Sequence, residues 1–347
     1  MAKYSGTKIT KTIFVFAIVV FSFILLPGCS SRMKDQKIPV KILILPKFEV
    51  GELTGDFPGE AQYFYEAYVA DGDVYDIEGS TNAAKLYYKD GIAICLLGQG
   101  KTNAAINTAA VLSDKRFDFS EAYILGVGCG GTAEGYGIFG DVFVISTAVD
   151  CDFGHWVDSR ELNNQTGTTW FHDKTLDDYA VVQLDQSLTN RVFELVKDLK
   201  LETTENTVKF LQKEYAGEAW ADRAPKVMRG TTLTSDRYWK GTYNHQNALL
   251  IAETYHCQDP YAVTEMEDIA VARAAESFGL ADRLIILRTA VNMDVFPTGM
   301  TPEMLWRSDD YIASEASLES VDIFETAMQN CFEAGKVLID AILEGAL

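Results

Sequence analysis

The most informative part of the chain reads Thr264-Glu265-Met266-Glu267-Asp268, and it is followed at a short distance by Arg288-Thr289-Ala290-Val291-Asn292-Met293-Asp294. The first stretch precedes an Ala-rich helical pattern over 269–278, and the second follows an apolar run over 284–287 that is typical of a buried strand. In an extended segment, residues two positions apart point to the same side. We therefore expect Glu265 and Glu267 to lie on one wall of a site.

Two carboxylates arranged in this way suit a ligand with paired hydroxyl groups. A carboxylate has two acceptor oxygens, which match the vicinal hydroxyls of a ribose ring. A negative group beneath a sugar also stabilises the positive charge of an oxocarbenium ion. The alternative interpretation is a solvated acidic helix start, because acidic residues are favoured near helix N-termini.

Residues 1–28 have the features of a secretory signal, in which three lysines precede the apolar residues 13–26. The run ends at Pro27-Gly28-Cys29, and this small residue before a cysteine resembles a bacterial lipoprotein signal, in which Cys29 is lipidated and becomes the new N-terminus. An uncleaved anchor helix is the alternative, but the apolar run is short for a bilayer span of about 20 residues. We predict an exported, membrane-anchored lipoprotein of the bacterial cell envelope, with a signal peptide over 1–28, a tether over 29–38 and one domain over 39–347.

The chain is strongly acidic, with 30 basic residues, 50 acidic residues and a formal net charge of −20. Nucleic acids and anionic lipid surfaces bind positive patches, so this balance argues against both as partners. Beyond residue 28 no window approaches 18 uninterrupted apolar residues. Any role in transport is therefore expected to be indirect, or to involve a separate transporter.

The cysteines and histidines show no spacing that is typical of a metal site. The five cysteines after Cys29 are widely spaced and form no C-x-x-C pair, and the four histidines form no H-x-x-x-H pair. We predict no metal site, and buried thiols at Cys95 and Cys331, which lie in apolar patterns. One disulfide is compatible with export, but the sequence does not identify its partners.

Strand-like and helix-like patterns alternate along the domain. The predicted strands cover 40–45, 92–97, 122–125, 142–146, 226–233 and 284–287. The predicted helices cover 61–67, 104–113, 184–199, 246–255, 269–278 and 317–343. This alternation predicts an α/β fold, with a single domain built on a mixed, mostly parallel sheet flanked by helices.

The run Gly126-Val127-Gly128-Cys129-Gly130-Gly131 follows the predicted strand over 122–125. It matches the G-x-G-x-x-G fingerprint of dinucleotide binding, which requires a helix directly after the glycines. Residues 132–139 contain two further glycines and precede another strand pattern, so they do not support that helix. We interpret the run as a loop that leaves the backbone amides of Gly128 and Gly130 close to a ligand.

Tyr238 and Trp239 follow the strand pattern over 226–233. Aromatic residues at the end of a strand stack on planar bases, whereas an aromatic pair is more often part of a core. The irregular, aromatic segment 151–180 is a candidate lid, or a contact in a homo-oligomer.

The order of these features resembles the purine nucleoside permease family, whose members are similar to nucleoside phosphorylases and nucleosidases. The matching stretches are 98–105, the glycine run with Gly140-Asp141, 233–241, 263–268 and 285–294. The resemblance implies a nucleoside-phosphorylase-like fold and a purine nucleoside as ligand. It also implies that Glu267 binds the ribose hydroxyls, with Met266 beneath the sugar and Glu265 beside it, and that Tyr238 or Trp239 stacks on the purine.

The same resemblance points to three candidate catalytic residues. The position that usually carries a base-contacting acid is Asn292 here, with Asp294 two residues further on, and Glu49 loosely matches an acid that contacts the sugar or activates water. Departure of a purine is assisted by a proton at N7. Asn292 donates only through its amide, which suits the O6 acceptor of a 6-oxopurine. We therefore predict a preference for inosine or guanosine over adenosine.

Two functions remain open from the sequence. The first is a surface-tethered protein that binds purine nucleosides and supports their uptake, with cleavage of the N-glycosidic bond. The second is a non-catalytic receptor that delivers its ligand to a separate transporter. Phosphorolysis would use inorganic phosphate as co-substrate, held by Lys101, Arg229, Arg288 or the amides of 128–131, whereas hydrolysis would use water and a base such as Glu49 or Glu265. No other cofactor is expected.

Overall fold

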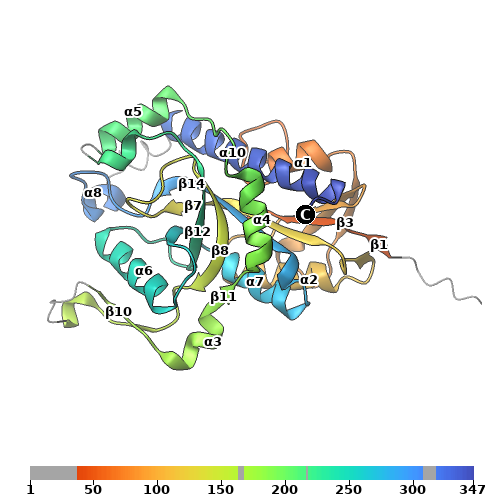
Figure 1. Ribbon diagram of the computed structural model, residues 1–347, viewed down its shortest axis with the longest axis horizontal. Coiled ribbons are helices and arrows are strands. Elements are labelled where there is room, and N and C mark those ends of the chain that lie inside the picture. The colour runs from red at the N-terminus through yellow and green to blue at the C-terminus, as the bar shows by residue number, and fades with distance from the viewer. Residues whose placement is uncertain (1–36, 163–167, 216–217, 308–317) are drawn as a thin grey trace, which may run out of the picture. The chain divides into compact units, whose positions relative to one another are not determined.

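The computed structural model of the protein describes residues 37–162, 168–215, 218–307 and 318–347, which fall within one unit, Lys37–Leu347 (Figure 1). The predicted signal peptide, most of the predicted tether and Cys29 lie outside the described residues.

Strands and helices alternate along this unit. The strands are β1 (Ile38–Pro39), β2 (Ile42–Leu45), β3 (Asp73–Asp76), β4 (Lys85–Lys89), β5 (Ile92–Cys95), β6 (Phe117–Asp118), β7 (Tyr123–Thr132), β8 (Val142–Asp150), β9 (His155–Trp156), β10 (Trp170–Phe171), β11 (Val181–Gln183), β12 (Val227–Thr234), β13 (Tyr261–Glu265) and β14 (Leu284–Met293). The α-helices are α1 (Gln62–Tyr68), α2 (Lys101–Ser113), α3 (Asp177–Ala180), α4 (Gln186–Val196), α5 (Glu205–Glu214), α6 (Thr242–Thr254), α7 (Asp268–Ser277), α8 (Pro302–Arg307) and α10 (Leu318–Glu344). Short 3-10 turns are η1 (Thr81–Ala83), η2 (Ser159–Glu161), η3 (Lys174–Leu176), η4 (Ala219–Asp222) and η5 (Ala281–Arg283).

One large mixed sheet carries most of the strands, in the order β11-β8-β12-β13-β7-β2-β5-β4-β3, with β14 paired to both β7 and β8. The central strands β5, β2, β7 and β14 run parallel to one another, and β4 and β3 extend one edge as antiparallel strands. The pairings of β7, β14, β8, β12 and β13 close into a ring. The strand ends that build the candidate site therefore come together at one end of this ring.

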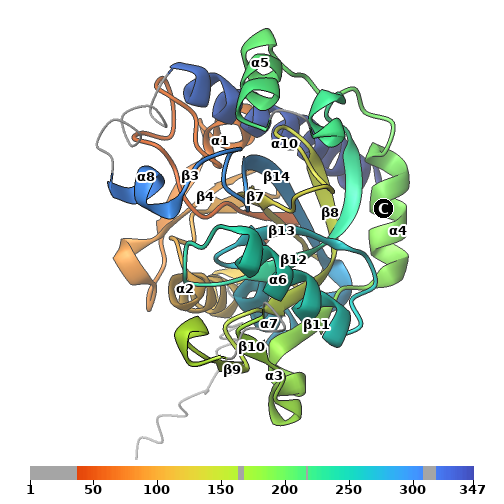
Figure 2. The same cartoon turned by 90° about the vertical axis from the view of Figure 1, so that its left-hand side faces the viewer.

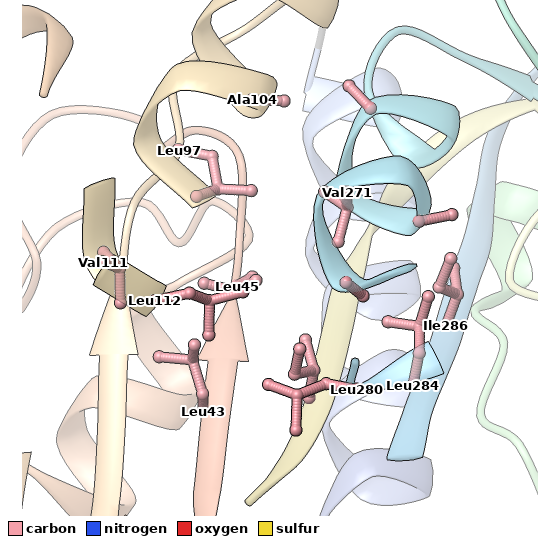
Figure 3. Close-up of a cluster of buried hydrophobic side chains, with 14 of the residues drawn as sticks. Leu43, Leu45, Leu97, Ala104, Val111, Leu112, Val271, Leu280, Leu284 and Ile286 are labelled. Carbon is pink, nitrogen blue, oxygen red and sulfur yellow. The ribbon is translucent and has the colours of Figure 1, made fainter. Parts of the chain in front are cut away.

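Helices cover both faces of the sheet, because the central strands such as β2 have apolar side chains on both faces. The side chains of β2 alternate, so that Leu43 and Leu45 pack with α2 and α7, whereas Ile42 and Ile44 pack with α1, α4 and α10. Figure 3 shows the first of these clusters, with Leu43 and Leu45 facing Leu97 and Leu112. Figure 2 shows α10 on one side of the strands and α2 with α7 on the other. A strand buried on both faces needs a continuous apolar run, as in 42–45.

The structure confirms the predicted α/β class and corrects one local prediction. Residues 126–131 are not a loop, because β7 runs through the whole glycine run and pairs with β14 and then β13. Glycine is unfavourable in a strand interior, but it is required where other groups approach closely. A Cβ on Gly130 would lie 2.5 Å from the carbonyl oxygen of Thr264, and one on Gly128 would lie 2.6 Å from the guanidinium of Arg288.

The predicted buried thiols are also confirmed, since Cys95 and Cys331 are both buried. The five described cysteines are free thiols, so the described residues contain no disulfide.

Candidate ligand-binding site

One pocket lies where β7, β13 and β14 end and the chain leaves β12. About 150 Å³ of it is open to the centres of water-sized groups, and it opens to solvent. The pocket is lined by Glu60, Gln99, Cys129, Gly130, Gly131, Arg237, Tyr238, Trp239, Thr264, Glu265, Met266, Glu267, Arg288, Val291, Asn292, Met293 and Asp294.

Arg288 of β14 lies at the floor of the pocket with only 1% of its side chain exposed. Its guanidinium contacts Asp268 at 2.6 and 2.8 Å, Glu265 at 2.9 Å and Glu267 at 3.2 Å. Burial lowers the pKa of Arg288, but these carboxylates outweigh that effect and raise it well above its usual value. A buried cation is stable only when nearby anions compensate its charge. The three acidic side chains that compensate Arg288 are therefore held in position around its guanidinium.

A second buried cation supports the same network. Lys47 is 1% exposed, and its ammonium lies 3.3 Å from Asp268 and donates to the carbonyl of Val127 at 2.9 Å. Burial raises the pKa of Asp268, but Arg288 and Lys47 together bring it below its usual value. Asp268 therefore remains an anion inside the protein.

Glu265 is enclosed by donors. One oxygen accepts the hydroxyls of Thr232 and Thr234, and the other accepts the backbone N–H groups of Glu267 and Asp268 as well as Arg288. Two carboxylate oxygens offer about four acceptor positions, and five donors already occupy them. Although Glu265 lines the pocket, its main contacts fix the turn from β13 into α7.

Glu267 is the acidic residue with acceptor capacity left. It is 4% exposed, lies at the N-cap of α7, and accepts the backbone N–H of Gly100 on Oε1 at 2.9 Å and Arg288 on Oε2 at 3.2 Å. Burial raises the pKa of Glu267, and Arg288 opposes that rise. In the described part of the chain each of its oxygens accepts one hydrogen bond, which leaves one acceptor position on each for a pair of ligand hydroxyls. Met266 lines the pocket beside it.

The opposite end of the pocket carries amide and aromatic groups. Asn292 donates from its amide to the hydroxyl of Tyr238, while its own carbonyl oxygen is buried and has no hydrogen-bond partner in the part of the chain that the structure describes. Tyr238 is 65% exposed at the pocket, and Trp239 packs with its ring centroid 6.4 Å from that of Tyr261. Flat rings and an unpaired acceptor at one end suit a planar heterocycle with N–H donors.

Asp294 lies behind this end of the pocket. Its carboxylate accepts His245 at 2.7 Å, the hydroxyl of Tyr261 at 2.9 Å and the backbone N–H of Glu134 at 3.0 Å. Burial lowers the pKa of His245, but the hydrogen bond to Asp294 and the charges of Asp294 and Glu134 raise it above its usual value. With three donors already bound, Asp294 acts here as an acceptor.

Several predicted site residues lie elsewhere. Glu49 does not line the pocket, and its carboxylate accepts the backbone N–H groups of Gly59, Ala61 and Gln62 at the start of α1. Gly128 pairs with Arg288 in the sheet and also stays outside the lining, whereas Gly130 is part of it.

The cations predicted to hold phosphate are already paired. Lys101 contacts Asp150 at 2.8 Å and Asp152 at 2.9 Å, and Arg229 contacts Asp259 at 2.9 Å. Neither lines the pocket. Arg288 does, but it is surrounded by carboxylates.

Sequence reasoning missed Glu60 as a residue of the pocket. It is 5% exposed, accepts the backbone N–H groups of Lys47 at 2.7 Å and Cys129 at 2.9 Å, and lies 3.8 Å from Arg288. In the sequence, Glu60 is noticeable only because it directly precedes the predicted helix over 61–67. The sequence does not tell whether Glu60 or Glu49 faces the sheet. Gln99, beside Gly100, was missed as an individual contact but lies in a stretch that carried the family resemblance.

No helix within the described ranges is both long enough and apolar enough to cross a membrane.

Known proteins are similar to this chain over most of its length. A "probable purine nucleoside permease" of Schizosaccharomyces pombe is 28% identical over 276 residues, which is 71% of this chain and 74% of that protein. A purine nucleoside permease of Candida albicans is 28% identical over 251 residues, covering 66% of this chain and 61% of that protein.

Solved structures share the fold. A 5′-methylthioadenosine/S-adenosylhomocysteine nucleosidase of Neisseria meningitidis, in complex with methylthio-immucillin-A, matches 87% of this chain and 99% of its own, with a TM-score of 0.50 and 15% identity. A futalosine hydrolase mutant of Helicobacter pylori matches 87% of this chain and 99% of its own, with a TM-score of 0.52 and 15% identity. These matches confirm the predicted nucleoside-phosphorylase-like fold.

The model of one protein family, described as purine nucleoside permease, matches residues 39–346, nearly the whole of the predicted domain. This match agrees with the fold and with the fungal relatives, and so the chain belongs to the purine nucleoside permease family.

Proposed function

We propose that the pocket binds a purine nucleoside in support of nucleoside uptake, with the ribose held at Glu267 and the purine at Tyr238 and Asn292. The observation that carries this proposal is the burial, orientation and remaining hydrogen-bond capacity of the Glu267 carboxylate. It is buried, it is oriented by Gly100 and Arg288, and it keeps one acceptor position on each oxygen at the pocket surface. Vicinal hydroxyls match that pair of acceptors, and the family to which the chain belongs supports a purine nucleoside as ligand.

The charges of the pocket favour water over phosphate as any second reactant. Four carboxylates line it, from Glu60, Glu265, Glu267 and Asp294, and its two arginines are both in ion pairs. A phosphate dianion placed here would meet more negative than positive charge. If the nucleoside is cleaved, the reaction that these residues support is hydrolysis, with Glu60 as the candidate base because it lines the pocket and Glu49 does not.

A receptor function is the second candidate, and Asp294 favours it. Its carboxylate is held by three hydrogen-bond donors, and Asn292 has no proton to give to a departing purine. A pocket that has no proton donor beside the purine favours binding of a nucleoside over cleavage of its N-glycosidic bond.

One experiment separates these functions. The purified protein is incubated with inosine, with and without inorganic phosphate, and free hypoxanthine is measured beside equilibrium binding of inosine. Product that forms equally in both conditions supports hydrolysis, and product that requires phosphate supports phosphorolysis. Binding without product supports the receptor, whereas neither binding nor product contradicts the proposal.

The anchoring of the protein completes the proposal. A lipid on Cys29 would hold the domain at the membrane through the short tether that ends at residue 38. The test is labelling of cells with a tagged fatty acid, in which the full chain should carry the label and Cys29→Ser should not. Label on Cys29→Ser, or no label on the natural protein, would contradict this part.

A further inference from the structure

A second, smaller cavity adjoins the base end of the nucleoside pocket. Both cavities are lined by Arg237 and Trp239, whereas Glu267 and Gln99 line only the first. The two cavities therefore share a wall, formed by Arg237 and Trp239, at the purine end and not at the sugar end.

Buried apolar side chains make up half of the lining of the second cavity. Leu233 of β12 is 0% exposed, and Ala248 and Ile251 of α6 are 2% and 1% exposed. Cys151 is also buried, and the rest of the lining consists of Trp156, Trp239, Asn244 and Arg237. Burying an alkyl group against such side chains is favourable because it removes apolar surface from water.

One polar group in this lining has no partner among the described residues. The indole Nε1 of Trp156 is buried, and no described residue accepts a hydrogen bond from it. The guanidinium of Arg237 lies over the Trp156 ring, 4.3 Å from its centroid, and its Nε donates to Asp152 at 3.1 Å. The indole is therefore held in place, with a donor left unsatisfied, and an acceptor on a ligand would remove that cost.

The size of the cavity limits what it can hold. About 50 Å³ of it is open to the centres of water-sized groups. By the same kind of measure one water needs about 10–15 Å³, and an engineered cavity that binds benzene has about 150 Å³. The space therefore fits roughly three to five heavy atoms, and it is too small for an aromatic ring.

We infer that this cavity is a subsite for a short, mainly apolar substituent on the purine, carried on the edge opposite the sugar and containing one hydrogen-bond acceptor. The inference rests on the proposed function, since the ribose must lie at Glu267 for the far edge of the base to face Trp239 and Arg237. The ligand class is a purine nucleoside alkylated on its six-membered ring, at the exocyclic nitrogen of position 6 or position 2.

The test is equilibrium binding of two nucleoside series to the full chain. One series is adenosine with N6-propyl, N6-(2-methoxyethyl) or N6-benzyl groups, and the other is guanosine with the same groups on N2. In at least one series, affinity should rise about fourfold for each methylene buried, which corresponds to about 0.8 kcal/mol. The methoxyethyl group should bind more tightly still, and the benzyl group should lose the gain.

Variants assign the gain to this cavity. Ala248→Leu fills the space and should abolish the gain while the parent nucleosides still bind, and Trp156→Phe should remove only the advantage of the methoxyethyl group. Leu249→Ala is the matched control, because Leu249 lies on the exposed face of the same helix and is 47% exposed. It should change nothing.

The outcomes are distinguishable. Parent nucleosides that bind without any gain from the substituents, or a gain that survives Ala248→Leu, would overturn this inference alone. Parent nucleosides that do not bind would overturn the proposed function, and this inference with it. If Ala248→Leu does not fold, the affinities of the natural protein for the propyl, methoxyethyl and benzyl nucleosides still test the inference.

Discussion

The backbone N–H of Gly100 donates to Oε1 of Glu267 at 2.9 Å, although the two residues are 167 positions apart in the chain. Gly100 is the N-cap of α2 and Glu267 is the N-cap of α7, so this carboxylate lies at the start of two helices. Helix N-termini stabilise negative charge, and Arg288 adds to that effect from the floor of the pocket. The fold thus places one buried, oriented carboxylate at the surface of the cavity.

Replacing Glu267 should weaken nucleoside binding. The change Glu267→Ala removes a charge-assisted contact with the diol that is worth about 1.5–3 kcal/mol, so affinity for inosine should fall roughly 10- to 100-fold. Isothermal titration measures this directly. The control is Glu276→Ala, since Glu276 lies on the same helix and pairs with Arg273 at the surface. Unchanged affinity in Glu267→Ala would remove the sugar from this part of the pocket.

Asn292→Asp should change which purine is preferred. The predicted preference for a 6-oxopurine has the amide N–H of Asn292 turn from Tyr238 to O6, whereas a carboxylate would accept the 6-amino group instead, so preference should move toward adenosine. Binding of inosine, guanosine and adenosine to both proteins measures the shift. Gln99→Glu adds the same charge near the sugar end and should leave the base preference as it is. An identical profile for Asn292→Asp would mean that this residue does not face the base.

Loss of Arg288 should destabilise the protein strongly. Arg288→Met leaves Asp268, Glu265 and Glu267 buried with too little positive charge, and breaking a buried pair in this way costs about 3–5 kcal/mol. Lys209→Met removes a pair with Glu205 in which both side chains are more than half exposed, and it should cost far less than Arg288→Met. Chemical denaturation compares the two variants. Similar small losses would mean that Arg288 is not central to the folded state.

His245 should give the protein a pH-dependent contribution to stability. Its pKa is raised above the usual 6.5 in the folded protein, so its contribution is complete below that value and is lost as pH rises through the folded pKa. The difference in unfolding free energy between the natural protein and His245→Asn should therefore be larger at about pH 5 than at about pH 9. A difference that does not vary with pH, or that grows as pH rises, would contradict the His245–Asp294 contact.

The sequence predicted the fold well because the core strands carry their own signal. The runs at 42–45 and 284–287 are apolar on both faces, and they became the central strands β2 and β14. The solvated alternative for Glu265 and Glu267 is excluded, since they are 6% and 4% exposed. The spacing of these residues identified the pocket wall correctly, but it did not show that Glu265 is already saturated.

What the sequence did not show depends on contacts between distant segments. The donors around Glu265 include Thr232 and Thr234, which belong to another strand. The glycine run appeared to be a loop because glycine is rare in strands, and only the close approach of Arg288 and Thr264 explains it. The choice between Glu49 and Glu60 depends on the path of the loop before α1, for which local sequence contains no rule.

The central claim is that Glu267 binds the ribose diol, and a double-mutant cycle between protein and ligand tests it most directly. Inosine and 2′,3′-dideoxyinosine are titrated into the natural protein and into Glu267→Ala. The natural protein should bind 2′,3′-dideoxyinosine roughly 10- to 100-fold more weakly than inosine. Glu267→Ala should bind the two ligands with almost equal affinity. An equal loss in both proteins would show that the hydroxyls are bound elsewhere and would contradict the account.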